Sequence, residues 1–172
     1  LGAEVVKIEP RNGAPSRRIG PFRNDNQDPE QSLHFWHYNR GKLSVQLSPD
    51  HGREELDHLL QGADVLLDAS GGECNHLLGL DREAVLARYP HLIVARMTPF
   101  GDTGPWKDFK GSDLVHLALG GVMMNCGYDP DPAGHYDLPP VAPQLWHAYH
   151  IAGEHLAMGI AAAIVHAQNT GH

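Results

Sequence analysis

The residues best placed to do chemistry lie in a glycine-rich segment near the middle of the chain. The segment contains Gly101, Gly104 and Gly111, and its end is flanked by Lys110 and Asp113. A buried apolar strand precedes it and an apolar helix follows it, with Asp113 predicted as the N-cap of that helix. Loops at the carboxyl end of a strand in an α/β sheet commonly bind ligands, and glycines let the backbone approach them closely. The segment therefore predicts a ligand-binding loop.

The 13 histidines raise the question of a metal site. His150 and Glu154 are four residues apart and can share one face of a helix. Their surroundings fit neither H-E-x-x-H nor H-x-x-E-H, however. Cys74 and His76 form a short pair with no second pair at ligand spacing. We therefore expect no metal site.

Apolar strands alternate with helices along the chain, which is typical of a mostly parallel sheet with helices on both faces. The expected fold is thus α/β and Rossmann-like. The expected strands are 4–8, 43–47, 65–67 and 92–97. The first expected helix begins at 48–50 and ends at Gly62, and the other expected helices are 76–78, 82–89, 114–124 and 145–167. Residues 10–31 and 125–143 are rich in Pro, Gly and Asp and predict long loops, which are often functional.

Composition narrows the class of protein. The 172 residues carry a formal charge of −8, from 13 basic and 21 acidic side chains, with no basic cluster, so nucleic acid is not an expected partner. The two cysteines suit a reducing cytosol. The apolar stretch 151–165 is interrupted by Glu154 and His155 and is too short to span a bilayer. We expect a soluble, cytoplasmic protein with no membrane partner.

Four segments together resemble the class III CoA-transferases, the family of carnitine dehydratase, formyl-CoA transferase and 2-methylacyl-CoA racemase. The first runs LGAEVVKIEP from Leu1, and the second reads NRGKLSV from Asn39. The third reads ADVLL from Ala63, and the fourth reads GDTGP from Gly101. Their order and spacing match the family, and the resemblance covers essentially all 172 residues.

The resemblance implies a covalent mechanism and also a departure from it. Family members attack an acyl-CoA with an Asp carboxylate, forming an anhydride and then an enzyme-bound CoA thioester. The matching position here holds Tyr149, whose phenol cannot form that anhydride, and no Asp or Glu lies between Leu138 and Glu154. The racemase branch pairs this Asp with a His, and the matching position holds Ser112. We therefore expect Tyr149 to be inactive as a nucleophile.

The resemblance also implies a set of CoA-binding positions. Ala69 and Ser70 stand where family members often have Asn-Phe, and Leu77 stands where a basic residue would meet a CoA phosphate. For any single cation, an ordinary solvated side chain is the simpler interpretation. Placement in loops at strand ends favours a binding role for Lys42 and Lys110. The full set of expected CoA-binding residues is Arg40, Lys42, Leu47, Ala69, Ser70, Gly71 and Lys110.

By resemblance, residues 1–172 form part of the large domain of the family, without its first strand and its distal domain. Family members form interlocked homodimers, so a homodimer or a tandem second copy is expected. Two functions remain open. The first is CoA transfer between an acyl-CoA and a carboxylic acid. The second is a non-catalytic domain that binds acyl-CoA or supports assembly, such as the degenerate half of a tandem fusion.

Overall fold

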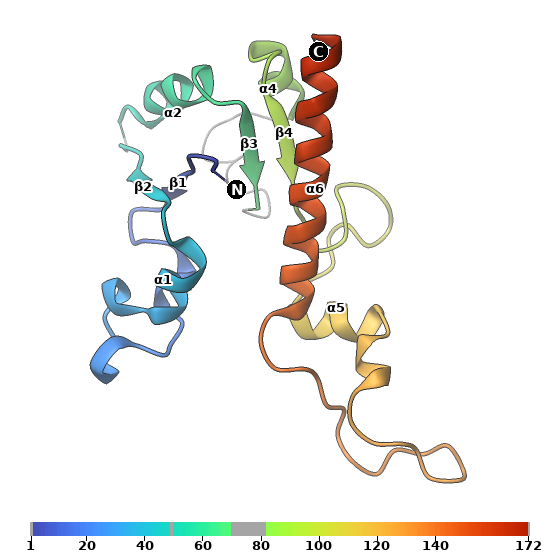
Figure 1. Cartoon of the computed structure of the whole chain (residues 1–172). Helices are drawn as coiled ribbons and strands as arrows, with labels where there is room; N and C mark the ends of the chain where they lie inside the picture. Colours follow the sequence, from blue (N-terminus) through green and yellow to red (C-terminus); the bar gives the residue numbers. More distant parts are fainter. Residues whose placement is uncertain (1, 49, 70–81, 172) are drawn as a thin grey trace. The chain divides into compact units, whose positions relative to one another are not determined.

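The computed structural model describes residues 2–48, 50–69 and 82–171, in two compact units, Leu1–Gly62 and Ala63–His172 (Figure 1). Each unit contains one pair of parallel strands accompanied by helices. The expected α/β class, with parallel strand pairing, is therefore confirmed. The predicted short helix at 76–78 lies outside the described residues.

The first unit is built on the parallel pair β1 and β2, in which Glu9 lies opposite Gln46. Its elements, in chain order, are β1 (Val6–Glu9), η1 (Pro15–Arg18), η2 (Arg23–Asp25), η3 (Pro29–Gln31), α1 (Leu33–Asn39), β2 (Leu43–Gln46) and α2 (Gly52–Gln61). The predicted loop 10–31 contains three short 3-10 helices, and α1, which the sequence did not predict, follows it before β2.

Helix α1 depends on one buried hydroxyl group. Ser32 has no exposed surface, and its Oγ accepts a hydrogen bond from the backbone N–H of Phe35 at 3.0 Å, which caps the helix. The same hydroxyl donates to the carbonyl oxygen of Ile19 at 2.6 Å. Ser32 therefore joins the start of α1 to the preceding segment.

Helix α2 ends where the sequence predicts but begins at Gly52, later than the expected start at 48–50. Leu56 and Leu60 are buried on one face, and Gly62 follows as the C-cap residue. Glu54 and Glu55 stand in the first turn, where negative charge is favourable.

The second unit carries the parallel pair β3 and β4 and the long helix α6, which runs alongside β4 and packs on α5 (Figure 1). Its elements are β3 (Val65–Asp68), α4 (Arg82–Arg88), β4 (Ile93–Arg96), α5 (Asp113–Leu119), η4 (Val122–Asn125) and α6 (His147–Thr170). Its buried apolar side chains are Val85, Tyr89, Leu92, Ala95 and Leu117.

Two predictions about α5 are wrong. The helix does not continue to residue 124, because Gly121 adopts a left-handed conformation with φ of 76° and separates α5 from η4. Asp113 is not its N-cap, because Ser112 Oγ accepts from the Val115 N–H at 3.3 Å and takes that role. The Asp113 carboxylate is thereby free to bond elsewhere.

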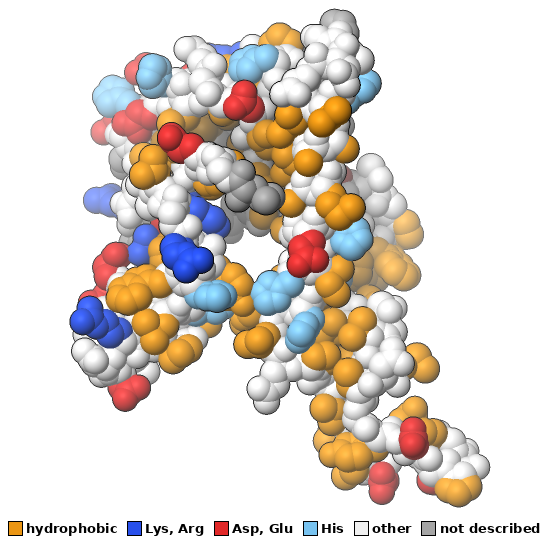
Figure 2. All heavy atoms as spheres, viewed as in Figure 1, with side chains coloured by type: hydrophobic (Ala, Val, Ile, Leu, Met, Phe, Trp, Pro, Cys, Tyr) orange, Lys and Arg blue, Asp and Glu red, His pale blue; other side chains and the backbone are white. Residues whose placement is uncertain are grey.

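Helix α6 is longer than the apolar stretch from which its length was judged. It runs for 24 residues, and by length and composition it is the one helix in the described part of the chain that could cross a membrane. The length limit applied to residues 151–165 therefore does not hold for the whole helix. This is a weak indication by itself, since core helices of soluble proteins pass the same test. Apolar side chains at Ile151, Met158 and Val165 are exposed at a spacing of seven residues. Figure 2 shows hydrophobic side chains at the surface along α6.

Candidate active site

The carboxyl ends of β3 and β4 are joined by an ion pair. Arg96, the last residue of β4, lies in register with Asp68, the last residue of β3. Its Nε donates to Asp68 Oδ2 at 3.2 Å, and its Nη1 donates to Asp102 Oδ2 at 3.1 Å. Asp68 is buried, and Asp102 belongs to the glycine-rich loop. Arg96 therefore fixes the start of this loop to the ends of both strands.

A polar cavity of about 250 Å³ lies beside this ion pair. Its lining residues are Arg96, Thr98, Pro99, Gly101, Asp102, Lys107 and Asp108. The cavity lies at the carboxyl end of a parallel strand, where ligands commonly bind in α/β folds. Gly101 and Gly104 adopt φ values of 83° and 89°, which other residues rarely tolerate. The glycine-rich loop is therefore where the sequence predicts it, with backbone conformations that require glycine.

The imidazole of His116 joins the two ends of the glycine-rich loop. Its Nδ1 lies 2.7 Å from the Ser112 carbonyl oxygen, and its Nε2 lies 2.9 Å from the Pro99 carbonyl oxygen. A Cβ atom on Gly111 would lie 2.6 Å from both His116 Cε1 and Pro99 Cβ. Gly111 is therefore required by close packing, because the two ends of the loop meet at the imidazole of His116.

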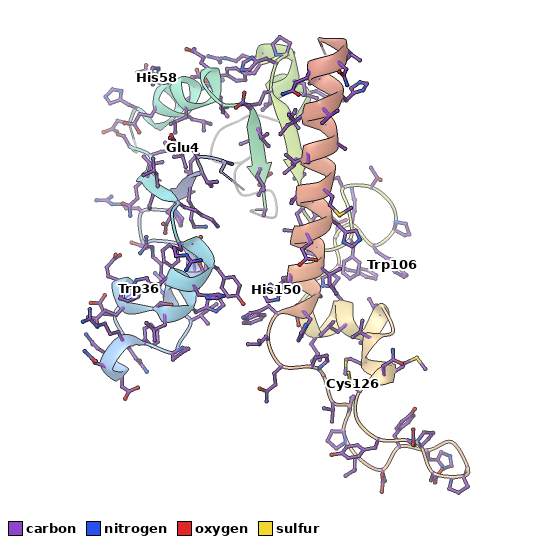
Figure 3. The ribbon with its side chains drawn as sticks, viewed as in Figure 1. Glu4, Trp36, His58, Trp106, Cys126 and His150 are labelled. Carbon is purple, nitrogen blue, oxygen red and sulfur yellow. The ribbon has the colours of Figure 1, made fainter. Side chains whose placement is uncertain are left out.

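Three aromatic side chains cluster on the loop. Trp106 and Phe109 stack with their ring centroids 6.4 Å apart, and Phe100 meets each of them edge-on. Trp106 and Phe109 are both more than half exposed. Figure 3 labels Trp106 on this loop, between β4 and α5. The cluster gives the loop its own internal packing and an apolar outer surface.

The start of α6 is capped by a carboxylate from α5. Asp113 Oδ1 accepts from the backbone N–H of Ala148 at 2.8 Å and from that of Tyr149 at 3.3 Å. Asp113 is buried, with 7% of its surface exposed. Trp146, the N-cap residue of α6, makes no capping hydrogen bond with its side chain. The carboxylate therefore satisfies backbone donors that the local sequence leaves open.

Tyr149, the predicted position of the family nucleophile, lies directly at this cap. Its side chain is 45% exposed and stacks on Trp146, with the ring centroids 5.8 Å apart. The phenol is thus directed toward solvent and the Trp146 ring, while the backbone of the same residue bonds Asp113. The structure brings Asp113 and position 149 together.

Sequence reasoning missed this pairing. Asp113 and Ala148 are 35 residues apart, so no pattern near Tyr149 points to Asp113. One signal was present in the sequence: the long helix starts at Trp146 and His147, neither of which is a favoured capping residue. A capping group from elsewhere was therefore needed.

Of the predicted CoA-binding residues, Arg40, Lys42 and Leu47 belong to the first unit. Lys42 directly precedes β2 and therefore lies at the amino end of that strand, whereas Leu47 directly follows its last residue. Lys42 and Leu47 therefore lie at opposite ends of β2. Lys42 Nζ donates to Asn39 Oδ1 at 3.1 Å. Burial, and then the charge of Lys7, lower the pKa of Lys42.

The remaining predicted residues belong to the second unit. Ala69 follows the last residue of β3 and is exposed, as is Lys110 at the end of the glycine-rich loop. Ser70 and Gly71 lie outside the described residues. Ser112, the position matched to the racemase His, caps α5.

The candidate metal ligands, mostly histidines, lie partly within the described residues. Among the residues that the structure describes, no group of three or more His, Cys, Asp or Glu side chains is placed to hold a metal ion. The rings of His147 and His150 lie with their centroids 6.4 Å apart. Cys74 and His76 lie outside the described residues.

Comparison with known proteins gives a consistent result. Residues 1–172 match the sequence profile described as CoA-transferase family III. The chain is 36% identical to the succinyl-CoA:(R)-benzylsuccinate CoA-transferase subunit BbsE of Thauera aromatica, over 99% of this chain and 40% of that protein. It is 33% identical to the formyl-CoA:oxalate CoA-transferase of Streptomyces avermitilis, over 99% of this chain and 39% of that protein.

Comparison with solved structures agrees with the sequence comparison. A CAIB/BAIF family protein from Brucella suis matches with a TM-score of 0.83 and 29% identity, over 99% of this chain and 44% of that chain. The chain spans about 40% of the length of the curated relatives it matches.

Proposed function

This chain belongs to CoA-transferase family III, and on that basis we propose that it takes part in the transfer of CoA between an acyl-CoA thioester and a carboxylic acid. The observation that carries this proposal is the match of all 172 residues to the family. The polar cavity at the carboxyl end of β4 supports it, since it offers a cationic side chain, Lys107, and exposed glycine backbone. Both features suit a small carboxylic acid or the polar part of a thioester substrate.

Coenzyme A is the proposed substrate carrier. Cations that can meet its phosphates are Arg40, Lys42 and Lys110, and the proposed pantetheine and adenosine contacts are Leu47, Ala69, Ser70 and Gly71. We propose these positions from the resemblance, residue by residue.

We further propose that the protein is cytoplasmic and that residues 1–172 form part of the family's large domain, which works as a homodimer or with a tandem second copy. Exposed apolar side chains support a larger assembly. Besides the exposed face of α6, the segment 126–146 exposes Tyr128, Tyr136 and Leu145. Surfaces of this kind are commonly covered by protein.

A second function is favoured by one observation. Tyr149 occupies the position that the resemblance assigns to the nucleophilic Asp. A domain without that carboxylate would bind acyl-CoA or support assembly while another chain or copy transfers CoA. The name of BbsE describes that relative as a subunit of its CoA-transferase, which is consistent with a shared assembly for this chain too.

Two measurements separate these functions. Calorimetry reports CoA binding, and chromatography of thioesters reports transfer from succinyl-CoA or acetyl-CoA to a panel of carboxylic acids. Binding with transfer supports the first function, and binding without transfer supports the second. Replacing Lys42 or Lys110 with Ala should weaken CoA binding about 5- to 30-fold, the loss of one charge-assisted contact. Absence of both binding and transfer would reject CoA transfer and acyl-CoA binding alike, and would leave only a role in assembly.

A further inference from the structure

The polar cavity at the carboxyl end of β4 is lined by charged side chains, some of which are paired and some of which are not. Arg96 donates hydrogen bonds to the buried Asp68 and to Asp102 of the glycine-rich loop, so two carboxylates share its charge. Lys107 and Asp108 line the same cavity, and both are exposed. Neither of these two side chains makes a hydrogen bond or an ion pair with any residue that the structure describes. Lys107 thus offers the cavity an available positive charge, and Asp108 offers it an available acceptor.

The size of this cavity limits the ligand to a small molecule. Its volume is about 250 Å³, whereas sites for drug-sized ligands usually measure about 300–1,000 Å³. An apolar cavity of about 150 Å³ holds a benzene molecule, so the ligand here can be only a few atoms larger. A Cβ on Gly101 would meet no atom within 4 Å, so the loop backbone leaves this space open. The cavity therefore suits an acid of a few carbon atoms and not a whole acyl-CoA.

We propose that Lys107 and Asp108 select the acid that this chain binds, namely a small monocarboxylic acid with a hydroxyl or ammonium group on its second carbon. The carboxylate of the acid accepts from the ammonium group of Lys107, and its hydroxyl or ammonium group donates to the carboxylate of Asp108. The two residues are neighbours in sequence, with Cα atoms about 3.8 Å apart, so one small acid spans both. This inference rests on the proposed transfer of CoA between carboxylic acids, and it names the class of one of those acids.

The same charges disfavour dicarboxylic acids. A second carboxylate would lie near Asp102 and Asp108, and like charges about 4 Å apart in a solvated site reduce affinity about 5-fold. A plain monocarboxylic acid avoids this repulsion but gives Asp108 no donor. Because Asp108 is exposed, water satisfies it, and the loss is that of one hydrogen bond, about 2- to 10-fold. Affinity should therefore fall from the donor-bearing acid to the plain acid and then to the dicarboxylic acid.

Titration of the full chain with four acids tests this order. Glycine and glycolate carry the donor, propionate has the same size without it, and malonate adds a second carboxylate. Binding is followed by NMR through the backbone amide signals of residues 98–108. We expect glycine and glycolate to bind about 2- to 10-fold more tightly than propionate, and malonate to bind most weakly of the four.

Variants assign the selection to the two side chains. Lys107→Ala should weaken the binding of all four acids about 5- to 30-fold, and Lys107→Arg should retain most of it. Asp108→Asn keeps an acceptor but removes the charge, so malonate should gain about 5-fold relative to propionate while glycolate stays preferred over propionate. Arg53→Ala, at an exposed cation of α2, is the control and should bind every acid as the unmodified chain does.

The order among the four acids is measured on the unmodified chain, so it decides the selection even if a variant fails to fold. Glycolate no tighter than propionate, malonate as tight as glycolate, or no saturable binding of any acid overturns the inference, as does binding that Lys107→Ala leaves unchanged. CoA binding and CoA transfer are measured separately on the same chain. Transfer together with any of these outcomes leaves the proposed function standing, whereas selective acid binding by a chain that neither binds nor transfers CoA supports the acid site and rejects the proposed function.

Discussion

The guanidinium of Arg17 donates two parallel hydrogen bonds to the carboxylate of Glu9. Arg17 Nε lies 2.7 Å from Glu9 Oε2, and Arg17 Nη2 lies 2.9 Å from Glu9 Oε1. Glu9 is 3% exposed, and it also accepts from the backbone N–H of Ala14 and from the hydroxyl of Ser44 on β2. The guanidinium of Arg17 in turn lies 3.9 Å from the centre of the Phe35 ring. One buried ion pair thus ties β1, β2, η1 and α1 together within the first unit.

This pair makes the first unit sensitive to acid. The hydrogen bonds from Arg17, together with those from Ala14 and Ser44, outweigh burial and lower the pKa of Glu9 from 4.5 to about 2. Since the folded pKa is below the unfolded one, the stabilisation is fully present above pH 4.5 and is lost as the pH falls through about 2. Glu9→Gln should therefore cost about 3 kcal/mol of unfolding free energy at pH 7 and less at pH 2.

Urea unfolding of Glu9→Gln and of the unmodified chain between pH 2 and pH 7 measures this difference. Glu4→Gln, at an exposed carboxylate just before β1, is the control and should change stability little. A Glu9→Gln penalty that stays constant across this pH range would contradict the ionic role of Glu9.

A second prediction concerns Gly111 at the end of the glycine-rich loop. Gly111→Ala places a methyl group 2.6 Å from Pro99 Cβ and His116 Cε1, so we expect a loss of about 1–3 kcal/mol from overpacking. Gly153→Ala is the matched control, because a Cβ there meets no atom within 4 Å and lies in the interior of α6. It should stabilise the chain by about 0.5–1 kcal/mol. Thermal unfolding of both variants measures the contrast, and equal shifts would show that the packing at His116 is loose.

These contacts show what the sequence alone could predict. Parallel strands followed by helices were predictable, because Val65–Asp68 and Ile93–Arg96 are short apolar runs bounded by turn residues. The end of α2 was predictable from Gly62. The glycine-rich loop was predictable from Gly101 and Gly104. In each case the cause lies within a few residues.

What could not be predicted depends on residues far apart in the chain. The 3-10 helices after β1 are held by Glu9 and Arg17, and α1 is held by Ser32, whose hydroxyl bonds Ile19. The cap of α6 comes from Asp113, which local capping rules place at the start of α5 instead. Propensity and spacing describe neighbours in sequence, so a carboxylate that bonds a helix 35 residues away leaves no local pattern.

A third prediction compares two capping serines that differ in burial. Ser32 Oγ is fully buried and makes hydrogen bonds to Phe35 and Ile19, whereas Ser112 Oγ caps α5 through Val115 alone. Ser32→Ala should cost about 2–3 kcal/mol, since the Ile19 carbonyl oxygen loses its donor as α1 loses its cap. Ser112→Ala should cost about 1 kcal/mol, the usual value of a helix cap. Chemical denaturation that gives the larger loss for Ser112→Ala would contradict this ranking.

The last prediction concerns the carboxylate that the family places at position 149. Tyr149→Asp restores a carboxyl group there, yet we expect little gain of CoA transfer. The side chain of residue 149 is 45% exposed beside Trp146, so a shorter Asp would be solvated and free to rotate rather than held by donors. Misplacement of a reacting group by about 1 Å can cost on the order of a hundredfold. In the unmodified background the new charge would also lie near Asp113, whose Oδ1 is 3.3 Å from the backbone nitrogen of residue 149.

Tyr149→Phe is the control and should transfer CoA as the unmodified chain does, since the phenol has no assigned role. Transfer assays on these variants decide the point: robust activity of Tyr149→Asp would show that position 149 is competent by itself and that the surrounding pocket is intact.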